Sequence, residues 1–142
     1  MSIPNKIKIG ILGAGGKMGM RISANLNKLP NEIFYIENAE TGIKRLAQSG
    51  LKVSAQAEVM DQVDVLILAV PDILINKIST EVGPDLKAGA TVILLDPAAA
   101  YMNQVFIRKD LHYTAIHPCH PALFKDQPTL EGYNDHFGGI LT

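Results

Sequence analysis

The chain has 142 residues, of which 47% are hydrophobic and 19% charged, and its formal net charge is −1. This length and composition predict one domain with a single sizeable core, and they exclude a disordered chain. Because the 13 lysines and arginines are scattered along the sequence, we expect no nucleic-acid partner. The single cysteine, Cys119, excludes an internal disulfide framework and favours a reducing compartment.

The apolar runs of the chain are too short to cross a membrane. The longest, residues 63–71, is interrupted by Asp64 and lies far below the roughly 20 residues that a bilayer requires. The first, residues 7–12, is broken by Lys8 and Gly10 and is too short for the apolar core of a secretory signal. We therefore expect a cytoplasmic protein without membrane contact.

Short apolar runs rich in β-branched residues alternate with helical patterns along the chain. In chain order we expect a strand near 6–12, a helix over 17–29, a strand near 32–37, a helix over 39–48, a short strand near 51–54, a strand near 63–70, a helix over 71–82, and strands near 90–95, 111–117 and, at the sheet edge, 137–141. Pro30 stops the first helix, Gly50 caps the second, and Pro71 suits the first turn of the third. This alternation predicts one α/β domain over residues 1–142, a Rossmann-type doubly wound parallel sheet with helices on both faces.

A glycine-rich loop joins the first expected strand to the first expected helix. In such loops a first glycine permits a tight turn, a second lets the backbone approach a pyrophosphate, and the last lets the helix pack closely on the sheet. Free N–H groups and the helix dipole then face the phosphates. Met18 occupies the third glycine position of the commonest fingerprint, so the loop fits the longer spacing Gly13-x-x-Gly16-x-x-Gly19. The expected cofactor-binding residues here are Gly13, Ala14, Gly15, Gly16, Lys17, Met18 and Gly19.

The same residues allow a test of other interpretations of this loop. A nucleoside triphosphate loop needs Ser or Thr after its lysine and a glycine six residues before that lysine, whereas Met18 follows Lys17 and Ile11 stands at the glycine position. That reading is excluded. A methyltransferase and a tight turn without any ligand remain open.

The choice of cofactor depends on Glu37, which ends the second expected strand. An acidic side chain at this position hydrogen-bonds the adenosine ribose and repels a 2′-phosphate, so it favours NAD over NADP. The alternative is an ordinary exposed glutamate, and Lys44 and Arg45 could soften the preference. Ligands of doubly wound sheets lie over the carboxyl ends of the strands, so we expect the residues after the strand near 63–70 to line the cofactor cleft as well; they are Ala69, Val70 and Pro71.

Two further segments end at the same edge of the expected sheet. Asp96, Pro97 and Ala98 are candidates for the substrate pocket, although an aspartate before a helix more often caps it. His117 and His120 are the candidate catalytic residues, with His117 also placed against the substrate, because a histidine can accept the hydroxyl proton when hydride leaves an alcohol carbon. The alternative is that both histidines are structural. With Cys119 they match no familiar zinc pattern, so we expect no metal.

Three segments together resemble a known class of enzymes. Residues 10–19 (Gly-Ile-Leu-Gly-Ala-Gly-Gly-Lys-Met-Gly), 69–72 (Ala-Val-Pro-Asp) and 117–121 (His-Pro-Cys-His-Pro) look like the N-terminal NAD-binding domain of 6-phosphogluconate dehydrogenase-like oxidoreductases. They are similar in particular to a bacterial branch with a phosphogluconate dehydrogenase C-terminal domain, which includes the D-apionate oxidoisomerases. The resemblance covers essentially the whole chain. It implies an NAD-dependent dehydrogenase that removes hydride from the alcohol of a small-molecule substrate, a hydroxy acid or sugar acid.

Prephenate dehydrogenases are similar in the glycine loop and in a His-Pro pair, whose histidine matches His117. Residues 119–121 depart from their pattern, so a prephenate dehydrogenase-like enzyme is the runner-up. The resemblance also implies a helical C-terminal domain that forms a homodimer and closes the substrate site, and that domain would begin where residues 138–142 end the chain. We therefore expect a cofactor domain with little activity of its own. A non-catalytic nucleotide-sensing module stays open as an alternative.

Overall fold

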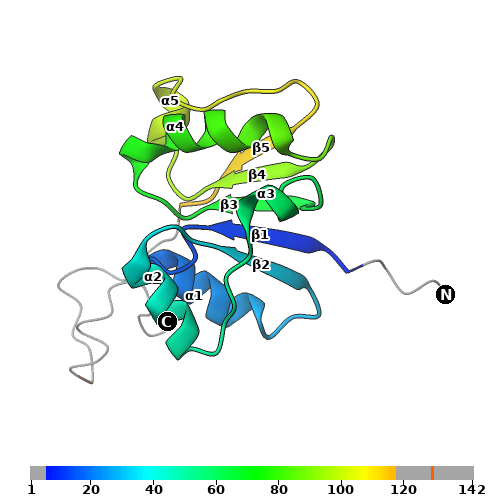
Figure 1. The fold of residues 1–142 in the computed structure, drawn as a ribbon. Coiled ribbons are helices and arrows are strands. Elements are labelled where there is room, and N and C mark those ends of the chain that lie inside the picture. Colours follow the sequence, from blue (N-terminus) through cyan, green and yellow to red (C-terminus); the bar gives the residue numbers. More distant parts are fainter. Residues whose placement is uncertain (1–5, 118–128, 130–142) are drawn as a thin grey trace.

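The computed structural model describes residues 6–117 and 129, which form a parallel sheet with helices on both faces (Figure 1). The elements in chain order are β1 (Lys8–Leu12), α1 (Lys17–Leu26), β2 (Glu32–Ile36), α2 (Glu40–Gln48), α3 (Gln56–Val59), β3 (Val65–Leu68), α4 (Asp72–Val82), the 3₁₀ helix η1 (Gly83–Asp85), β4 (Thr91–Leu94), α5 (Ala98–Tyr101) and β5 (His112–Ala115). The predicted α/β fold class is thereby confirmed.

The sheet has the strand order β2-β1-β3-β4-β5, and all four pairings are parallel. The strand expected near 51–54 is reduced to a single parallel bridge between Val53 and Tyr35, at the outer side of β2. With Val53 taken as a third strand, the sheet follows the order 3-2-1-4-5-6 of dinucleotide-binding folds. The order reverses between β1 and β3, so a ligand crevice is expected above the carboxyl ends of these two strands.

The core consists of two apolar layers, one on each face of the sheet. Side chains alternate between faces along a strand, so Leu66 and Leu68 of β3 pack toward α4, whereas Ile67 belongs to the opposite layer with Leu46 of α2. Figure 1 shows α4 and α5 on one side of the sheet and α1 and α2 on the other. Burial on both faces explains why these strands are continuous apolar runs rather than alternating ones.

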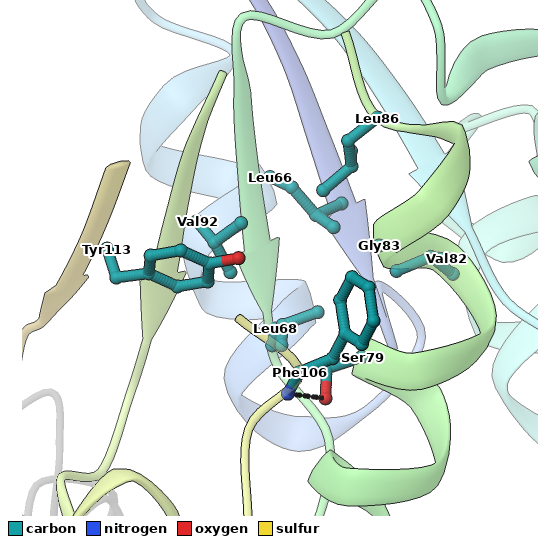
Figure 2. Close-up of a pocket in the computed structure, with 9 residues that line it drawn as sticks. All are labelled: Leu66, Leu68, Ser79, Val82, Gly83, Leu86, Val92, Phe106 and Tyr113. Carbon is teal, nitrogen blue, oxygen red and sulfur yellow. Dashed lines mark hydrogen bonds between the residues drawn. The ribbon is translucent and has the colours of Figure 1, made fainter. Parts of the chain in front are cut away.

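A small cavity lies inside the layer between α4 and the sheet, as Figure 2 shows. Its volume is about 10 Å³, which is at the lower limit for one water molecule. The ring of Phe106 points into the space between β3 and α4, and its backbone N–H donates to Ser79 Oγ at 2.9 Å. This cavity belongs to the packing of the core and has no room for an organic ligand.

The first expected helix is shorter than its sequence pattern. Residues 17–29 were expected to be helical, but α1 ends at Leu26, and Leu29 is 52% exposed. The amides of Lys28 and Leu29 instead bond to Asn25 and Leu26, three residues back. Pro30 disfavours helical backbone at Leu29, so the last turn tightens before the proline.

Other element boundaries agree with expectation within a few residues. Gly50 adopts φ +72° after α2, as its expected capping role requires. Pro71 precedes α4 at the N-cap rather than lying in its first turn. The sequence pattern did not predict α3, α5 or η1, and the strand expected at 137–141 lies outside the described residues. Within residues 6–117, no helix is long and apolar enough to span a bilayer.

Candidate functional site

A cleft of about 470 Å³ opens at the crevice between β1 and β3. Its walls come from the loop after β1, the segment after β2, the segment after β3, and one face of α4. Six of the residues expected to bind the cofactor line it: Gly13, Gly16, Glu37, Ala69, Val70 and Pro71. The fold therefore brings together the two ends of the expected site, which are more than fifty residues apart in the sequence.

Two glycines of the loop are required by packing alone. Gly13 has φ +82°, and a Cβ at this residue would overlap the carbonyl oxygen of Ala69. Gly19, in the first turn of α1, lies so close to the loop that its Cβ would overlap the carbonyl oxygen of Gly13. These are the turn and helix-packing roles expected for the first and last glycine of the longer spacing.

The two middle glycines divide their roles differently from expectation. The second glycine, Gly15, was expected to open the backbone to a ligand, but its missing Cβ makes room for the backbone of Gly42 on α2. Gly16 fits the ligand-facing role instead, because it lines the cleft and a Cβ there would meet only carbonyl oxygens of Gly13 and Ala69, at 3.2 and 3.8 Å. Ala14 is fully buried in the core.

The N-terminus of α1 begins at the cleft without a side chain to cap it. Gly16 is its N-cap residue, and the first turn contains no acidic residue. By contrast, Glu40 and Asp72 lie in the first turns of α2 and α4. First-turn amides of a helix lack an intrahelical acceptor and attract anions, so α1 offers its free N–H groups and the positive end of its dipole to a bound anion. Lys17 and Met18 supply amides of this turn although neither lines the cleft.

Glu37 is fixed by backbone amides on both of its carboxylate oxygens. Oε2 accepts a hydrogen bond from the N–H of Gly15 at 3.0 Å, and Oε1 accepts from the N–H groups of Asn38 and Ala39 at 2.9 Å each. A carboxylate has about four acceptor positions, so these bonds leave capacity for a ligand hydroxyl. The side chain is therefore a preorganised acceptor in the wall of the cleft, not a freely moving surface glutamate.

One wall of the cleft was missed by the sequence prediction. It is a face of α4 with residues at helical spacing, namely Leu74, Lys77, Ile78 and Glu81. Asn38 and Ala39 complete the wall after β2. The signal available in the sequence was the i, i+3, i+4, i+7 spacing of these residues in the helix after β3, beside the apolar face that packs on the core. Lys77 is thus the lysine in the cleft, whereas Lys44 pairs with Glu40 at 2.7 Å on the exposed side of α2.

Asp96 and His117 meet at the carboxyl edge of β4 and β5. Asp96 Oδ1 accepts a hydrogen bond from the N–H of Ala98 at 2.7 Å, which caps α5, and Oδ2 lies 3.3 Å from Nδ1 of His117. Pro97 is the N-cap residue of α5. The capping interpretation of Asp96 agrees with the bond from one oxygen to the start of α5, whereas its second oxygen faces a histidine. Its place in a substrate pocket stays a prediction. His120 and Cys119 lie outside the described residues.

The described residues contain no group of three His, Cys, Asp or Glu side chains arranged to hold a metal ion. Asp96 and His117 form a pair, which is one side chain short of such a group. What this edge offers is a histidine whose Nδ1 is oriented by a carboxylate and whose ring is 64% exposed. Such a pair can orient one ring nitrogen toward a substrate hydroxyl.

This chain is similar to several known proteins. A D-apionate oxidoisomerase from Pectobacterium atrosepticum is 46% identical over 132 residues, which cover 93% of this chain and 46% of that protein. A solved structure described as a semialdehyde dehydrogenase NAD-binding protein from Cupriavidus necator, in complex with calcium and NAD, matches with a TM-score of 0.82 and 43% identity over 93% of this chain and 48% of that one. The chain thus spans about half the length of these relatives.

Prephenate dehydrogenase, the runner-up by sequence pattern, is a more distant neighbour. The enzyme from A. aeolicus, solved with hydroxyphenyl propionate and NAD⁺, matches with a TM-score of 0.62 and 17% identity, which establishes a common fold and nothing more. The family model of the NADPH-binding domain of acetohydroxy acid isomeroreductase matches residues 3–127. The chain therefore belongs to this family of NAD(P)-binding domains, and its resemblance to oxidoreductases of the D-apionate oxidoisomerase type is confirmed.

Proposed function

We propose that this chain is the cofactor domain of an NAD-dependent oxidoreductase that acts on a hydroxy acid or sugar acid. The name of the similar D-apionate oxidoisomerases points to such a substrate. The observation that carries the proposal is the composition of the cleft. Glu37 lines it together with Gly16, the residue at which the uncapped helix α1 begins. NAD carries two linked phosphates and a ribose diol, and these residues match both groups. The amides of α1 would hold the pyrophosphate, and Glu37 would hold the ribose.

The preference for NAD over NADP is part of the proposal. A 2′-phosphate would bring negative charge next to the carboxylate of Glu37, whose position three amides fix. Arg45, which could have compensated, donates to the carbonyl of Gly15 at 2.8 Å and does not line the cleft. Lys77 is the positively charged side chain among the residues that line the cleft. Its charge would attract a 2′-phosphate and would therefore weaken the preference for NAD over NADP.

The bound NAD supplies the acceptor for the hydride that leaves the alcohol carbon. His117 would take the hydroxyl proton at its Nε2, because Asp96 faces Nδ1 and thereby orients the ring. Ala98 and Ala100 after Asp96 are small and exposed, whereas Ala99 packs into the core, so a small substrate would have room at this edge. His120 stays a candidate for the same task. Homodimer formation and exclusion of water are proposals for a protein that joins this domain to a second, helical one.

Binding is tested on the chain itself by titration with NADH and NADPH, followed by nicotinamide fluorescence and calorimetry. We expect NADH to bind more tightly, and Glu37→Gln to reduce the ratio of the two affinities by about tenfold, since roughly one charge-repulsion contact of 1.4 kcal/mol is removed. Glu40→Gln is the matched control, because Glu40 is exposed and pairs with Lys44 outside the cleft. Equal affinities for both nucleotides in the parent chain would refute the assigned preference.

Catalysis is tested in a chimera in which this chain replaces the homologous half of the Pectobacterium atrosepticum enzyme. We expect D-apionate-dependent NADH formation, and His117→Asn to lower kcat by about 100- to 10,000-fold, the usual contribution of a general base. His112→Asn is the matched control, since His112 is an exposed histidine at the opposite end of β5. Unchanged kcat in the His117 variant would remove this residue from the mechanism and direct attention to His120.

A further inference from the structure

The peptide groups on both sides of Gly15 are held by the β2–α2 unit. The N–H of Gly15 donates to Glu37 at 3.0 Å, and its carbonyl oxygen accepts from Nη1 of Arg45 at 2.8 Å. The next amide, that of Gly16, donates to the carbonyl of Gly13 at 3.0 Å. The peptide plane that leads into Gly16 is thus fixed at its oxygen by Arg45 and at its N–H by the loop.

Helix α2 reaches the loop because glycines replace side chains at the contact. The missing Cβ of Gly15 lets Gly42 lie directly against it, and a Cβ on Gly42 would lie 2.6 Å from the carboxyl carbon of Glu37. Arg45 follows Gly42 by three residues, so it projects from the same face of α2. Helix α2, the carboxylate of Glu37 and the loop therefore pack directly against one another.

We propose that Arg45 is a positioning residue for cofactor binding, which holds the Gly15–Gly16 peptide so that the free amides at the start of α1 face a pyrophosphate. This inference rests on the proposed function and deepens it. Arg45 does not line the cleft, so it acts through the loop rather than on the nucleotide. A loop that is already ordered loses less entropy when the ligand binds, and removal of its support lowers affinity without removal of any ligand contact.

The test compares NADH, NADPH and ADP binding by the 142-residue chain and three variants. Arg45→Met keeps an unbranched apolar stem and removes the donors, Arg45→Lys retains one donor nitrogen, and Lys44→Met is the control on the adjacent exposed position. We expect Arg45→Met to weaken NADH, NADPH and ADP by the same factor of about ten, Arg45→Lys to recover part of the loss, and Lys44→Met to stay within twofold of the parent. Thermal unfolding and the amide NMR spectrum establish that each variant is folded, and the resonances of Gly15 and Gly16 should shift in Arg45→Met.

Three outcomes contradict the inference, and each is distinct. Unchanged NADH affinity in a folded Arg45→Met variant overturns the positioning role and leaves the proposed function intact. A selective loss of NADPH shows that Arg45 contacts the 2′-phosphate directly, which also overturns it. A parent chain that binds none of the three nucleotides refutes the proposed function together with the inference.

Discussion

Gly16→Ala and Gly19→Ala should have opposite effects, although the two residues lie three positions apart in one loop. Gly16 has φ −71° and ψ 170°, a conformation open to any residue, and its added Cβ would meet the carbonyl oxygen of Gly13 at 3.2 Å. Alanine at such a position gains about 0.4–1 kcal/mol by restricting the unfolded chain, which offsets the tight contact. We expect the stability to change by less than about 1 kcal/mol, or about 4 °C in the unfolding midpoint.

The same substitution should abolish tight cofactor binding. The new methyl group would occupy the cleft wall where the proposed pyrophosphate meets the start of α1. A hydrogen bond to a charged group contributes about 1.5–3 kcal/mol, so the loss of one such bond weakens NADH binding by about 10- to 150-fold. Fluorescence titration with NADH measures this loss directly, and thermal unfolding of the same sample establishes that the variant is folded.

Gly19→Ala is the contrasting variant. Its Cβ would overlap the carbonyl oxygen of Gly13, and α1 can relieve this overlap only by moving away from the loop. Overpacking of this kind costs about 1–3 kcal/mol, which lowers the unfolding midpoint by roughly 4–12 °C. If Gly16→Ala bound NADH as tightly as the parent chain, the cleft at Gly16 would not be the phosphate site, and the argument from its geometry would fail.

Three further predictions concern stability. Leu46→Ala should reduce the free energy of unfolding by about 2–5 kcal/mol in urea titrations, because Leu46 is completely buried, whereas Ile43→Ala on the same helix, 39% exposed, should cost far less. Asp110→Asn should flatten acid denaturation. The guanidinium of Arg108 lowers the pKa of Asp110 from 3.8 to about 2, so the stability that this pair contributes is present above pH 3.8 and is lost as the pH falls toward 2; urea midpoints across that interval should fall less in the variant. Arg108→Met should lower the unfolding midpoint more than Lys109→Met, because Nη1 of Arg108 donates to three carbonyls beyond α4, at 2.8, 2.9 and 3.0 Å.

The sheet could be predicted from the sequence because its strands carry a strong local signal. Each central strand is buried on both faces, so it consists of consecutive apolar residues that end at Gly, Pro or Asp. Asp64, which breaks one such run, marks the true start of β3 at Val65, since its carboxylate accepts the N–H of Lys8 and pairs with Lys87. These contacts lower the pKa of Asp64, chiefly through the Lys87 hydrogen bond. Strand existence was therefore predictable, and its ends were set by tertiary contacts.

The elements that were missed have little local pattern. Residues 56–59 and 98–101 form helices of four residues, too short to display helical periodicity. The α5 turn is held by Asp96, whose second oxygen faces His117, 21 residues further along the chain. The cleft wall on α4 was missed for another reason. Periodicity identifies the buried face of a helix, whereas Lys77 lies on the face beside it, which only the packed structure places against the glycine loop.

The role of Gly15 shows why a glycine-rich motif alone does not establish that a loop binds a ligand. Gly13, Gly15 and Gly19 are each required by contacts within the protein, with Ala69, with Gly42 and with the loop itself. A fold that needed the same tight packing without any ligand would retain these three residues. Only Gly16 has no such requirement and instead faces the cleft. The evidence for a bound dinucleotide therefore comes from the position of Gly16 beside an uncapped helix and from Glu37, which lines the same cleft. The number of glycines in the loop is evidence for the fold.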